Sequence, residues 1–441
     1  MSTLAIKRWS GLDDAQRAAA LARPESSRDD ALLSAVAEII AEVRARGDAA
    51  LADFSERFDG GAPESLHVDP ADLERALAAC TYEDRQALEH ARDNIRTFHA
   101  AQATDLPWID VDSGVRCKQM RRPIDSVGLY VPGGSAPLPS ALLMLAIPAA
   151  LAGCPRVVVC SPPQSDGRIA PIVLAAAAVC GVTEVYAVGG AQAVAAMAYG
   201  TDTIAPVDKI YGPGNAYVTA AKMLAAQDPA GAACDMPAGP SEVLVIADAT
   251  ADPASVAADL LAQAEHGPDS QVLLFTDSDQ VAQDVGTAVA RQVPERSRRD
   301  IINQALANSR ALVFETMDEA LTVSNRYAPE HLILNLADAE QRVDAITNAG
   351  SIFVGPWAAE TFGDYCSGTN HVLPTYGFAR AYSGVTLSDF CKFITVQHLS
   401  ETGFDRLAGT AKRLALLEGL DAHAAAVTVR EALREQVRRR A

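Results

Sequence analysis

The chain has 441 residues, of which 49% are hydrophobic and only 5% aromatic, and its formal net charge is −19. This length is enough for roughly two to four domains with a sizeable core. The acidic balance argues against nucleic acid as a partner, because binding to phosphates needs clustered Lys and Arg.

The cysteines and the N-terminus predict a cytoplasmic protein. None of the eight cysteines forms a Cys-x-x-Cys pair, and Asp13 and Asp14 interrupt any early apolar segment. We therefore expect reduced thiols and no secretion signal. The most apolar window, residues 136–160, contains several prolines and Arg156. It predicts a helix followed by a strand, so we expect no membrane association.

The first part of the chain predicts an arm and then helices. Residues 1–27 are polar and weakly patterned, and we expect them to pack on another element. The helical patterns that follow make a lead-in without a long strand, and they cover residues 29–46, 49–58, 69–79 and 82–101.

From residue 126 short apolar strands alternate with helices. The strands are expected at 126–131, 156–160, 184–188 and 209–211, and the helices at 139–152, 169–180, 191–199 and 216–226. After a Gly/Pro-rich crossing at 231–241, further strands are expected at 242–246, 271–275, 311–314, 332–335 and 351–354. This pattern predicts two doubly wound α/β units with parallel sheets. We expect the motif-bearing loops at the carboxyl ends of the strands.

The last residues predict a helical tail, with helices at 389–397, 402–417 and 425–438. Such a tail, following two complete sheets, is a candidate for packing against another subunit. Packing on its own sheet is an equally open alternative.

The helix that should begin after Asp252-Pro253 ends at Gly267-Pro268. Gln263 and His266 are three residues apart and should share a face of its last turn, where they can supply half of a metal site. Alone, this segment favours a solvated Gln263 and a His266 that caps the last carbonyls of the helix.

Two further segments carry groups for proton transfer and metal binding. Glu330-His331 follows Pro329 and precedes an apolar strand, so the imidazole can act as a general base and the carboxyl group can orient it or activate water. Asp364 and His371 lie in a Gly- and Ser-containing loop, where Asp364 could join Gln263 and His266 in a mixed N/O site suited to zinc or manganese. A polar turn is the alternative reading of Glu330-His331. Glu418 and His423, at a helix break in the tail, would by themselves indicate two exposed polar residues.

Glycine-containing strand–helix junctions occur at 130–135, 189–192 and 211–215. Such loops let backbone N–H groups approach an anion such as a cofactor phosphate. No Gly-x-Gly-x-x-Gly follows the first strand, and plain tight turns use the same residues.

Seven motifs, in the same order along the chain, resemble those of histidinol dehydrogenase. They are GLYVPGG at 128–134, VGGAQA at 188–193, KIYGPGN at 209–215, DMPAGPSE at 235–242, QAEHG at 263–267, APEHL at 328–332 and GDYCSGTNHVLP at 363–374. The resemblance implies two successive NAD-linked oxidations of L-histidinol to L-histidine through bound L-histidinaldehyde. It also implies one zinc ion per subunit and an intertwined homodimer with shared active sites.

The resemblance assigns roles to residues of this chain. It implies Glu330 and His331 as the acid–base pair. The implied zinc ligands are Gln263, His266, Asp364 and, from the partner subunit, His423. The implied substrate contacts are Ser241, His371, Glu418, Glu330, His331 and the zinc ligands. The implied NAD contacts are Tyr130, Gln192 and Asn215.

The resemblance also implies a fold of two incomplete Rossmann-like domains with small terminal domains. We expect an arm at 1–27, a first α/β domain from 28–134 and 243–385, a second on the NAD side at 135–242, and a helical tail at 386–441.

Alternative functions are a dehydrogenase of another small alcohol, such as a sulfonated diol, a zinc hydrolase, and a non-catalytic binding protein. Aldehyde oxidation through a thiol, with Cys117 or Cys154, is an alternative chemical route.

Overall fold

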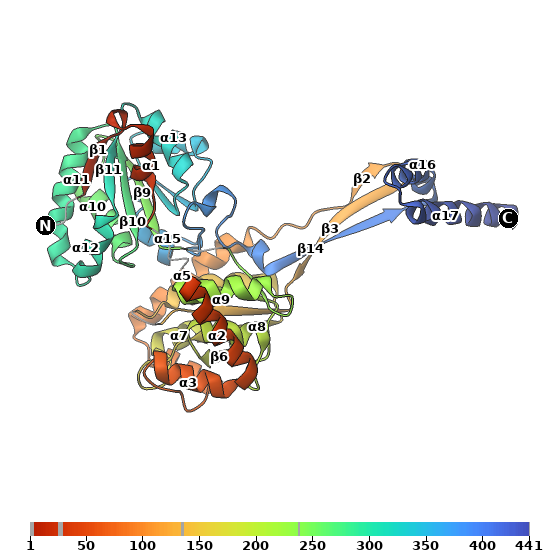
Figure 1. Cartoon of the computed structure of the whole chain (residues 1–441), viewed down its shortest axis with the longest axis horizontal. Coiled ribbons are helices and arrows are strands. Elements are labelled where there is room, and N and C mark those ends of the chain that lie inside the picture. The colour runs from red at the N-terminus through yellow and green to blue at the C-terminus, as the bar shows by residue number, and fades with distance from the viewer. Residues whose placement is uncertain (1–3, 25–29, 134–135, 237–238, 441) are drawn as a thin grey trace. The chain divides into compact units, whose positions relative to one another are not determined.

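The computed structural model describes residues 4–24, 30–133, 136–236 and 239–440. The chain forms two compact units (Figure 1). Unit 1 comprises residues 1–102 and 124–390, and unit 2 comprises residues 103–123 and 391–441.

Unit 1 contains a five-stranded parallel sheet with the order β6-β5-β4-β7-β8. The strands are β4 (Ser126–Tyr130), β5 (Arg156–Ser161), β6 (Glu184–Ala187), β7 (Lys209–Tyr211) and β8 (Ala233–Cys234). β4 is the first strand of this sheet in sequence and lies at its centre. β5 and β6 extend the sheet on one side of β4, and β7 and β8 extend it on the other side. This reversal is the topological switch point at which doubly wound sheets bind ligands.

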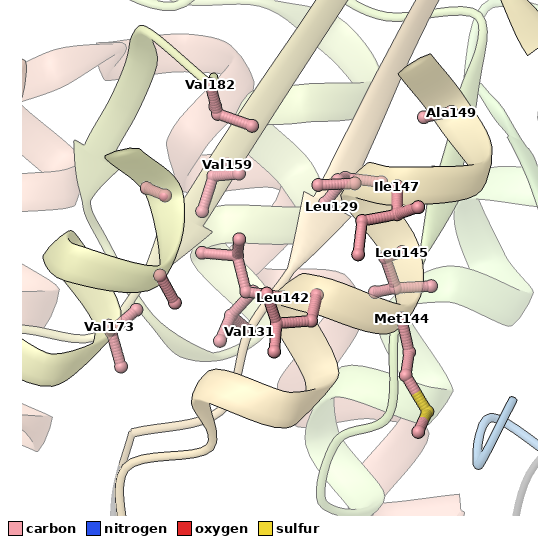
Figure 2. Packing of buried hydrophobic residues seen from close by; sticks show 14 of the residues in the cluster. Leu129, Val131, Leu142, Met144, Leu145, Ile147, Ala149, Val159, Val173 and Val182 are labelled. Atoms are coloured by element: carbon pink, nitrogen blue, oxygen red, sulfur yellow. The ribbon is translucent and has the colours of Figure 1, made fainter. Parts of the chain in front are cut away.

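Helices cover both faces of this sheet because its strands alternate two sets of apolar side chains. Leu129 and Val159 face α4 (Pro70–Ala79), α5 (Tyr82–Ala100), α6 (Pro139–Ala152) and α7 (Pro171–Cys180). Figure 2 shows part of this core, with Leu129, Leu142 and Val159 converging. Val158 and Cys160 face α2 (Asp30–Arg46), α3 (Asp48–Phe58), α8 (Gly190–Tyr199) and α9 (Ala216–Gln227).

The packing corrects the expected domain membership of the lead-in helices. We expected residues 28–134 to join the second α/β stretch, but α2 to α5 pack on the five-stranded sheet, and β4 is its central strand. The physical reason is that both faces of a parallel sheet need cover. The helices that connect the strands of this sheet cover part of each face, and α2 to α5 pack beside them and cover the rest.

The second sheet of unit 1 has six parallel strands in the order β1-β11-β10-β9-β12-β13. They are β1 (Ala5–Arg8), β9 (Glu242–Ala247), β10 (Gln271–Thr276), β11 (Arg310–Val313), β12 (His331–Asn335) and β13 (Ser351–Val354). One face packs on α10 (Pro253–Ala264), α11 (Asp279–Gln292) and α12 (Arg299–Ala307), and the other on α1 (Asp14–Leu21) and α13 (Met317–Tyr327). Short helices α14 (Ala339–Arg342) and α15 (Glu360–Tyr365) follow β12 and β13.

The N-terminal arm belongs to this sheet. Its residues 5–8 form edge strand β1, which pairs in parallel with β11 from Ala5 opposite Arg310 to Arg8 opposite Val313. The arm therefore packs on a sheet of its own chain. Arm residues 1–3 and 25–27, together with motif residues 134, 237 and 238, lie outside the described residues.

Local signals explain where many helices begin. The side chain of Asp69 accepts a hydrogen bond from Ala71 N at the start of α4, and Thr81 accepts one from Asp84 N at the start of α5. Asp252 caps α10 in the same way, with Pro253 as the first helical residue. Short 3-10 turns complete unit 1 at Trp9–Gly11, Val293–Glu295, Val343–Ala345, Phe378–Arg380 and Leu387–Phe390.

Unit 2 differs from the expected all-helical tail. It has an antiparallel sheet in which β3 (Val115–Pro123) lies between β2 (Ile109–Asp112) and β14 (Cys391–Leu399), followed by α16 (Glu401–Leu417) and α17 (Asp421–Arg440). The helix expected at 389–397 is therefore wrong, because this segment is mostly strand β14. The lead-in also contains a long strand, β3. The helices expected after residue 400 are confirmed.

The apolar window at 136–160 forms α6 and β5, as expected. No helix in the described part of the chain combines the length and the apolar character that crossing a bilayer requires.

Glycine positions provide a test of the packing. Gly286 lies inside α11, and a Cβ built there would meet no atom within 4 Å. We expect Gly286→Ala to raise the free energy of unfolding by about 0.5–1 kcal/mol, because alanine loses less backbone entropy in a helix. Urea denaturation measures the change.

The matched control is Gly212, which has φ +123° and where a Cβ would overlap the Tyr130 carbonyl oxygen. Gly212→Ala should lower the free energy of unfolding by at least about 2 kcal/mol. Equal effects of the two substitutions would contradict the packing described here.

Candidate active site

Glu330 and His331 lie at the junction between α13 and β12. Helix α13 ends at Tyr327, Ala328 adopts a left-handed conformation with φ +55°, and Pro329 prevents the helix from continuing. Both side chains are buried, with 6% and 3% of their surface exposed. Their positions are thus set by a helix end and by the first residue of a central strand.

The protonation of the His331 ring follows from its neighbours. Nδ1 lies 3.1 Å from the Glu242 carbonyl oxygen, and because a carbonyl can only accept, Nδ1 carries the proton. Nε2 is then the nitrogen that can gain or lose a proton, and it lies 3.3 Å from Oδ1 of Asp364. A histidine held in this tautomer can act as a base through Nε2.

The backbone of Glu242 also holds Glu330. Its Oε2 accepts a hydrogen bond of 2.8 Å from the Glu242 N–H and lies 3.6 Å from His331 Nδ1. Burial raises the pKa of Glu330 to about 8. Burial alone would lower the pKa of His331, but the charges of Glu360, Glu330 and Asp364 outweigh it and raise that pKa to about 10. With these charges alone His331 is protonated at neutral pH, and a cation held by the same carboxylates would lower its pKa and let Nε2 act as a base.

A candidate metal cluster lies beside this pair. His266, Glu360 and Asp364 each offer one ligand atom, and these atoms lie within 4.8 Å of one another. The neighbouring groups favour an orientation of the Gln263 amide in which its nitrogen donates to Glu360 and its oxygen accepts from Glu242 N–H at 3.2 Å. Three of the expected ligands, Gln263, His266 and Asp364, thus gather at one place in unit 1, although α10 already ends at Ala264, before His266.

The site lies at the amino ends of the strands of the six-stranded sheet, which corrects the expectation that all motif loops lie at carboxyl ends. Glu242 begins β9 and His331 begins β12, while Gln263 and His266 precede β10. Helices α10 and α13 therefore end here. The carbonyl end of a helix carries partial negative charge, which favours a cation.

Two expected substrate contacts are in the same unit. Ser241 directly precedes Glu242, and its carbonyl oxygen accepts from Gln271 N at 3.1 Å. His371 donates its backbone N–H to Met144 Sδ at 3.0 Å. The His371 Nε2 atom is buried without a hydrogen-bond partner in the described residues, and burial lowers the pKa of this ring. His371 can therefore offer a neutral nitrogen to a ligand.

The expected cofactor contacts follow strands of the five-stranded sheet. Tyr130 ends β4, and its buried hydroxyl accepts from Gly190 N at 3.1 Å. Gln192 is buried in the first turn of α8, and Asn215 caps α9 by accepting from Val218 N at 3.1 Å. These three residues lie at the carboxyl ends of β4, β6 and β7, near the switch point.

The remaining two expected residues belong to unit 2. Glu418 is the C-cap of α16 and His423 lies in the first turn of α17, and both are exposed. Among the described residues, neither side chain forms a hydrogen bond or an ion pair.

Comparison with known proteins identifies the family. The family described as histidinol dehydrogenase matches residues 21–431. The chain is 53% identical to a histidinol dehydrogenase of Vibrio parahaemolyticus and 54% identical to one of Xanthomonas euvesicatoria, with 96% of this chain covered in both and 97% and 98% of the relatives. The chain belongs to the histidinol dehydrogenase family. A crystal structure of histidinol dehydrogenase from Elizabethkingia anophelis, 43% identical, superposes with a TM-score of 0.94 over 98% of this chain and 99% of that one.

Membership of the histidinol dehydrogenase family makes this chain an oxidoreductase of histidine biosynthesis. The α/β class with parallel sheets and a helical C-terminal region is confirmed by the structure and by this likeness.

Three residues of this candidate site are not predicted from the sequence. Glu360 and Asp364 are four apart on α15 and so share a face, a spacing that could have revealed Glu360. Glu242 is the one charged residue at the start of an otherwise apolar strand. Arg23, which pairs with Glu242, lies in the arm and carries no local signal.

Asp59, which follows α3, contributes to the electrostatics of the cofactor side in this family member. Its Oδ2 is buried without a hydrogen-bond partner in the described residues, and burial raises its pKa to about 6. Burial also raises the pKa of Tyr130 to about 12, with a smaller contribution from the charge of Asp59. Asp59 therefore opposes folding when it is ionised.

This gives a pH-dependent prediction for Asp59→Asn. The folded state holds the Asp59 proton more tightly than the unfolded state, so the penalty is absent below the ordinary pKa of about 3.9 and complete above about 6. The variant should be more stable than the unchanged chain at pH 7, and the difference should shrink as the pH falls. Urea denaturation between pH 5 and 8 measures it, and a difference independent of pH would refute the assignment.

Proposed function

We propose that the protein is a zinc-dependent L-histidinol dehydrogenase that oxidises L-histidinol to L-histidine in two NAD-linked steps through bound L-histidinaldehyde. One observation carries the proposal. The Nε2 atom of His331, freed to act as a base by the hydrogen bond from Nδ1 to Glu242, faces Asp364 in the cluster that also contains His266. Base and candidate metal ligands therefore meet at one point.

The residues at this point fit a metal ion. Glu242, Glu330, Glu360 and Asp364 are all buried, with 1–7% exposure. In the described part of the chain, the cationic groups that ion-pair with them are Arg23 and His331. Buried carboxylates in excess of cations favour a bound metal ion. The mixed N/O donors of Gln263, His266 and Asp364 suit zinc, with His423 of the partner subunit as the fourth ligand.

Zinc, when bound, would hold the amine and imidazole of the substrate, and NAD, when bound, would accept the hydride. His331 removes the hydroxyl proton of the alcohol through Nε2, while Nδ1 remains hydrogen-bonded to Glu242. The hydrogen bond to the Glu242 carbonyl favours the imidazolium that forms, because it keeps a donor paired with an acceptor.

The second oxidation needs a water molecule to add to the aldehyde. Glu330 takes a proton from this water, and His331, 3.6 Å from the Glu330 carboxyl group, returns the proton gained in the first step to the aldehyde oxygen, which gives the hydrated aldehyde. His331, neutral again, then takes a hydroxyl proton of the hydrated aldehyde while a second NAD would accept the hydride, and the carboxylic acid forms. Ser241 and His371, with Glu418 of the partner subunit, orient the substrate, and Tyr130, Gln192 and Asn215 hold NAD.

A route through a thiol has less support. The Cys154 thiol donates to the Phe390 carbonyl oxygen at 3.6 Å, and Cys117 is in strand β3 of unit 2. Cys154 is thus hydrogen-bonded in the loop between α6 and β5 and Cys117 belongs to a strand, whereas Glu330 and His331 adjoin the candidate metal cluster. None of the eight cysteines forms a disulfide, which supports a reducing location such as the cytoplasm.

We further propose that two copies of the chain share their active sites. Helices α16 and α17 and the turn between them expose seven large apolar residues, each with 43–67% of its surface accessible. They are Leu414, Leu416, Leu417, Leu420, Val429, Leu433 and Val437. An exposed apolar surface of this kind supports cover by another chain. Glu418 and His423 lie among these residues, so an α16–α17 pair that packs on a second copy would bring them to it.

The activity test mixes the purified protein with L-histidinol and NAD. We expect two NADH, measured by absorbance, for each histidinol consumed. Chromatography should find one histidine for each histidinol consumed. A chelator should abolish turnover, because the substrate loses the zinc ion that holds it in place. Added zinc should restore turnover.

The result separates the candidate functions. One NADH per histidinol would contradict the second oxidation. NADH from a sulfonated diol but not from histidinol would identify the other dehydrogenase. Zinc-dependent hydrolysis without NADH would identify the hydrolase.

Mixing of variants tests the shared site. His331→Asn lacks the base and His423→Ala lacks the fourth ligand, so each alone should lose at least about 99% of turnover. After the subunits are exchanged, we expect about one quarter of full activity, because half of randomly formed dimers are mixed and each holds one complete site.

The control pairs His331→Asn with Glu330→Gln. Both changes affect the part of the site built by one chain, so no mixed dimer has a complete site, and activity should stay low. Mixed dimers of His331→Asn and His423→Ala that form, as detected by native mass spectrometry, but stay inactive would argue against sharing.

A further inference from the structure

Arg23 of the N-terminal arm forms a buried ion pair beside the proposed active site. Its Nε and one terminal nitrogen donate to the two carboxylate oxygens of Glu242, at 2.5 and 2.8 Å. The side chains are only 11% and 2% exposed. Burying two charges costs much of what their attraction gains, so stability alone is a weak reason for such a pair.

The backbone of Glu242 holds both members of the proton-transfer pair. Its N–H donates to Glu330 Oε2 and its carbonyl oxygen accepts from His331 Nδ1. A shift of this one peptide segment would therefore move the carboxyl group of Glu330 and change the tautomer or orientation of His331.

Arg23 also holds the segment that leads into the pair from the other side. The same terminal nitrogen donates to the carbonyl oxygens of Tyr327 and Ala328, at 2.9 and 3.3 Å, and the guanidinium lies 3.9 Å from the centre of the Tyr327 ring. Ala328 is a non-glycine residue with φ +55°, a conformation that is strained and persists only when its surroundings fix it. Glu330 follows two residues later.

We propose that Arg23 is a positioning residue that fixes the geometry of Glu330 and His331 through Glu242 and Ala328. This inference rests on the proposed function, because the geometry matters only if these two residues transfer protons. The planar fork of the guanidinium reaches both segments at once, which the single ammonium of lysine cannot do. The arm thus acts on the active site without touching the substrate.

The experiment compares Arg23→Ala, Arg23→Lys and the unchanged holoenzyme. We expect Arg23→Ala to lower kcat about 10- to 100-fold, as outer-shell changes do, with the KM for histidinol and the zinc content little changed. The kcat of Arg23→Lys should lie between that of Arg23→Ala and that of the unchanged enzyme. Added guanidinium at low concentration should restore part of kcat in Arg23→Ala, whereas urea, which has a similar shape but no charge, should not.

Arg17 provides the matched control. It lies on the same arm, hydrogen-bonds the Trp9 carbonyl oxygen at 3.4 Å and lies over the Trp9 ring, away from Glu242. Arg17→Ala should keep the kcat of the unchanged chain and should not respond to guanidinium. The double variant Arg23→Ala/Glu242→Gln should be no slower than Arg23→Ala, because the two side chains act as one unit.

Hydrogen exchange of the folded protein gives a readout without turnover. Peptides covering residues 240–247 and 326–335 should exchange faster in Arg23→Ala than in Arg17→Ala. Unchanged exchange there, or a normal kcat in folded Arg23→Ala, would overturn the positioning role. Failure of the unchanged chain to reduce NAD with histidinol would instead refute the proposed function, while faster exchange in Arg23→Ala alone would still support the structural link.

Discussion

The structure of the site depends on the gathering of buried carboxylates around one imidazole. Glu330, Glu360 and Asp364 lie within 3.3–3.8 Å of His331, and Glu242 contacts it through its backbone. Burial, with smaller contributions from repulsion between these carboxylates, raises the pKa of Glu330 to about 8 and raises that of Glu360 well above its usual range. A metal ion bound by Asp364 and His266 would supply the missing positive charge. A bound metal cation would therefore both balance the charge of the buried carboxylates and serve the proposed chemistry.

The two sheets of unit 1 contribute to function from opposite strand ends. In the five-stranded sheet the proposed NAD residues follow the strands, as in other doubly wound sheets. In the six-stranded sheet Glu242 and His331 begin the strands, and the ends of α10 and α13 lie beside them. The first arrangement offers helix N-termini and backbone N–H groups, which suit phosphate anions, whereas the second offers helix C-termini, which suit a cation. Each end thus matches the charge of its proposed ligand.

The sequence predicted the buried elements well because each leaves a local signal. Strands such as 209–211 and 351–354 and the helix at 139–152 match the structure to the residue, since apolar runs and flanking Gly and Pro mark them. The sequence predicts a helix in place of β14 because this exposed segment shows no alternation, although Phe393-Ile-Thr-Val396 has strong strand propensity. β3 is rich in Arg and Lys, and only its pairing with the distant β14 makes it a strand.

For the site, the sequence alone supplied weak pairs such as Gln263/His266, and the family resemblance supplied their roles. It could not supply Arg23 or Glu242. Their importance comes from contacts between residues more than 200 positions apart, and from backbone atoms of Glu242 that every residue type possesses. A local pattern cannot encode which peptide group faces an imidazole.

Unit 2 raises the question of why a biosynthetic enzyme would keep exposed leucines on α16 and α17. A unit built from one three-stranded sheet and two helices has too little core to bury both sides of its helices, so the outer sides remain apolar only if something covers them. If a second copy covers them, Glu418 and His423 arrive with the interface, and the last metal ligand is present only in the assembled dimer. Oligomerisation would then be a condition of catalysis, since the second imidazole would come from the tail of the partner. The same leucines would thereby ensure that metal binding follows correct assembly.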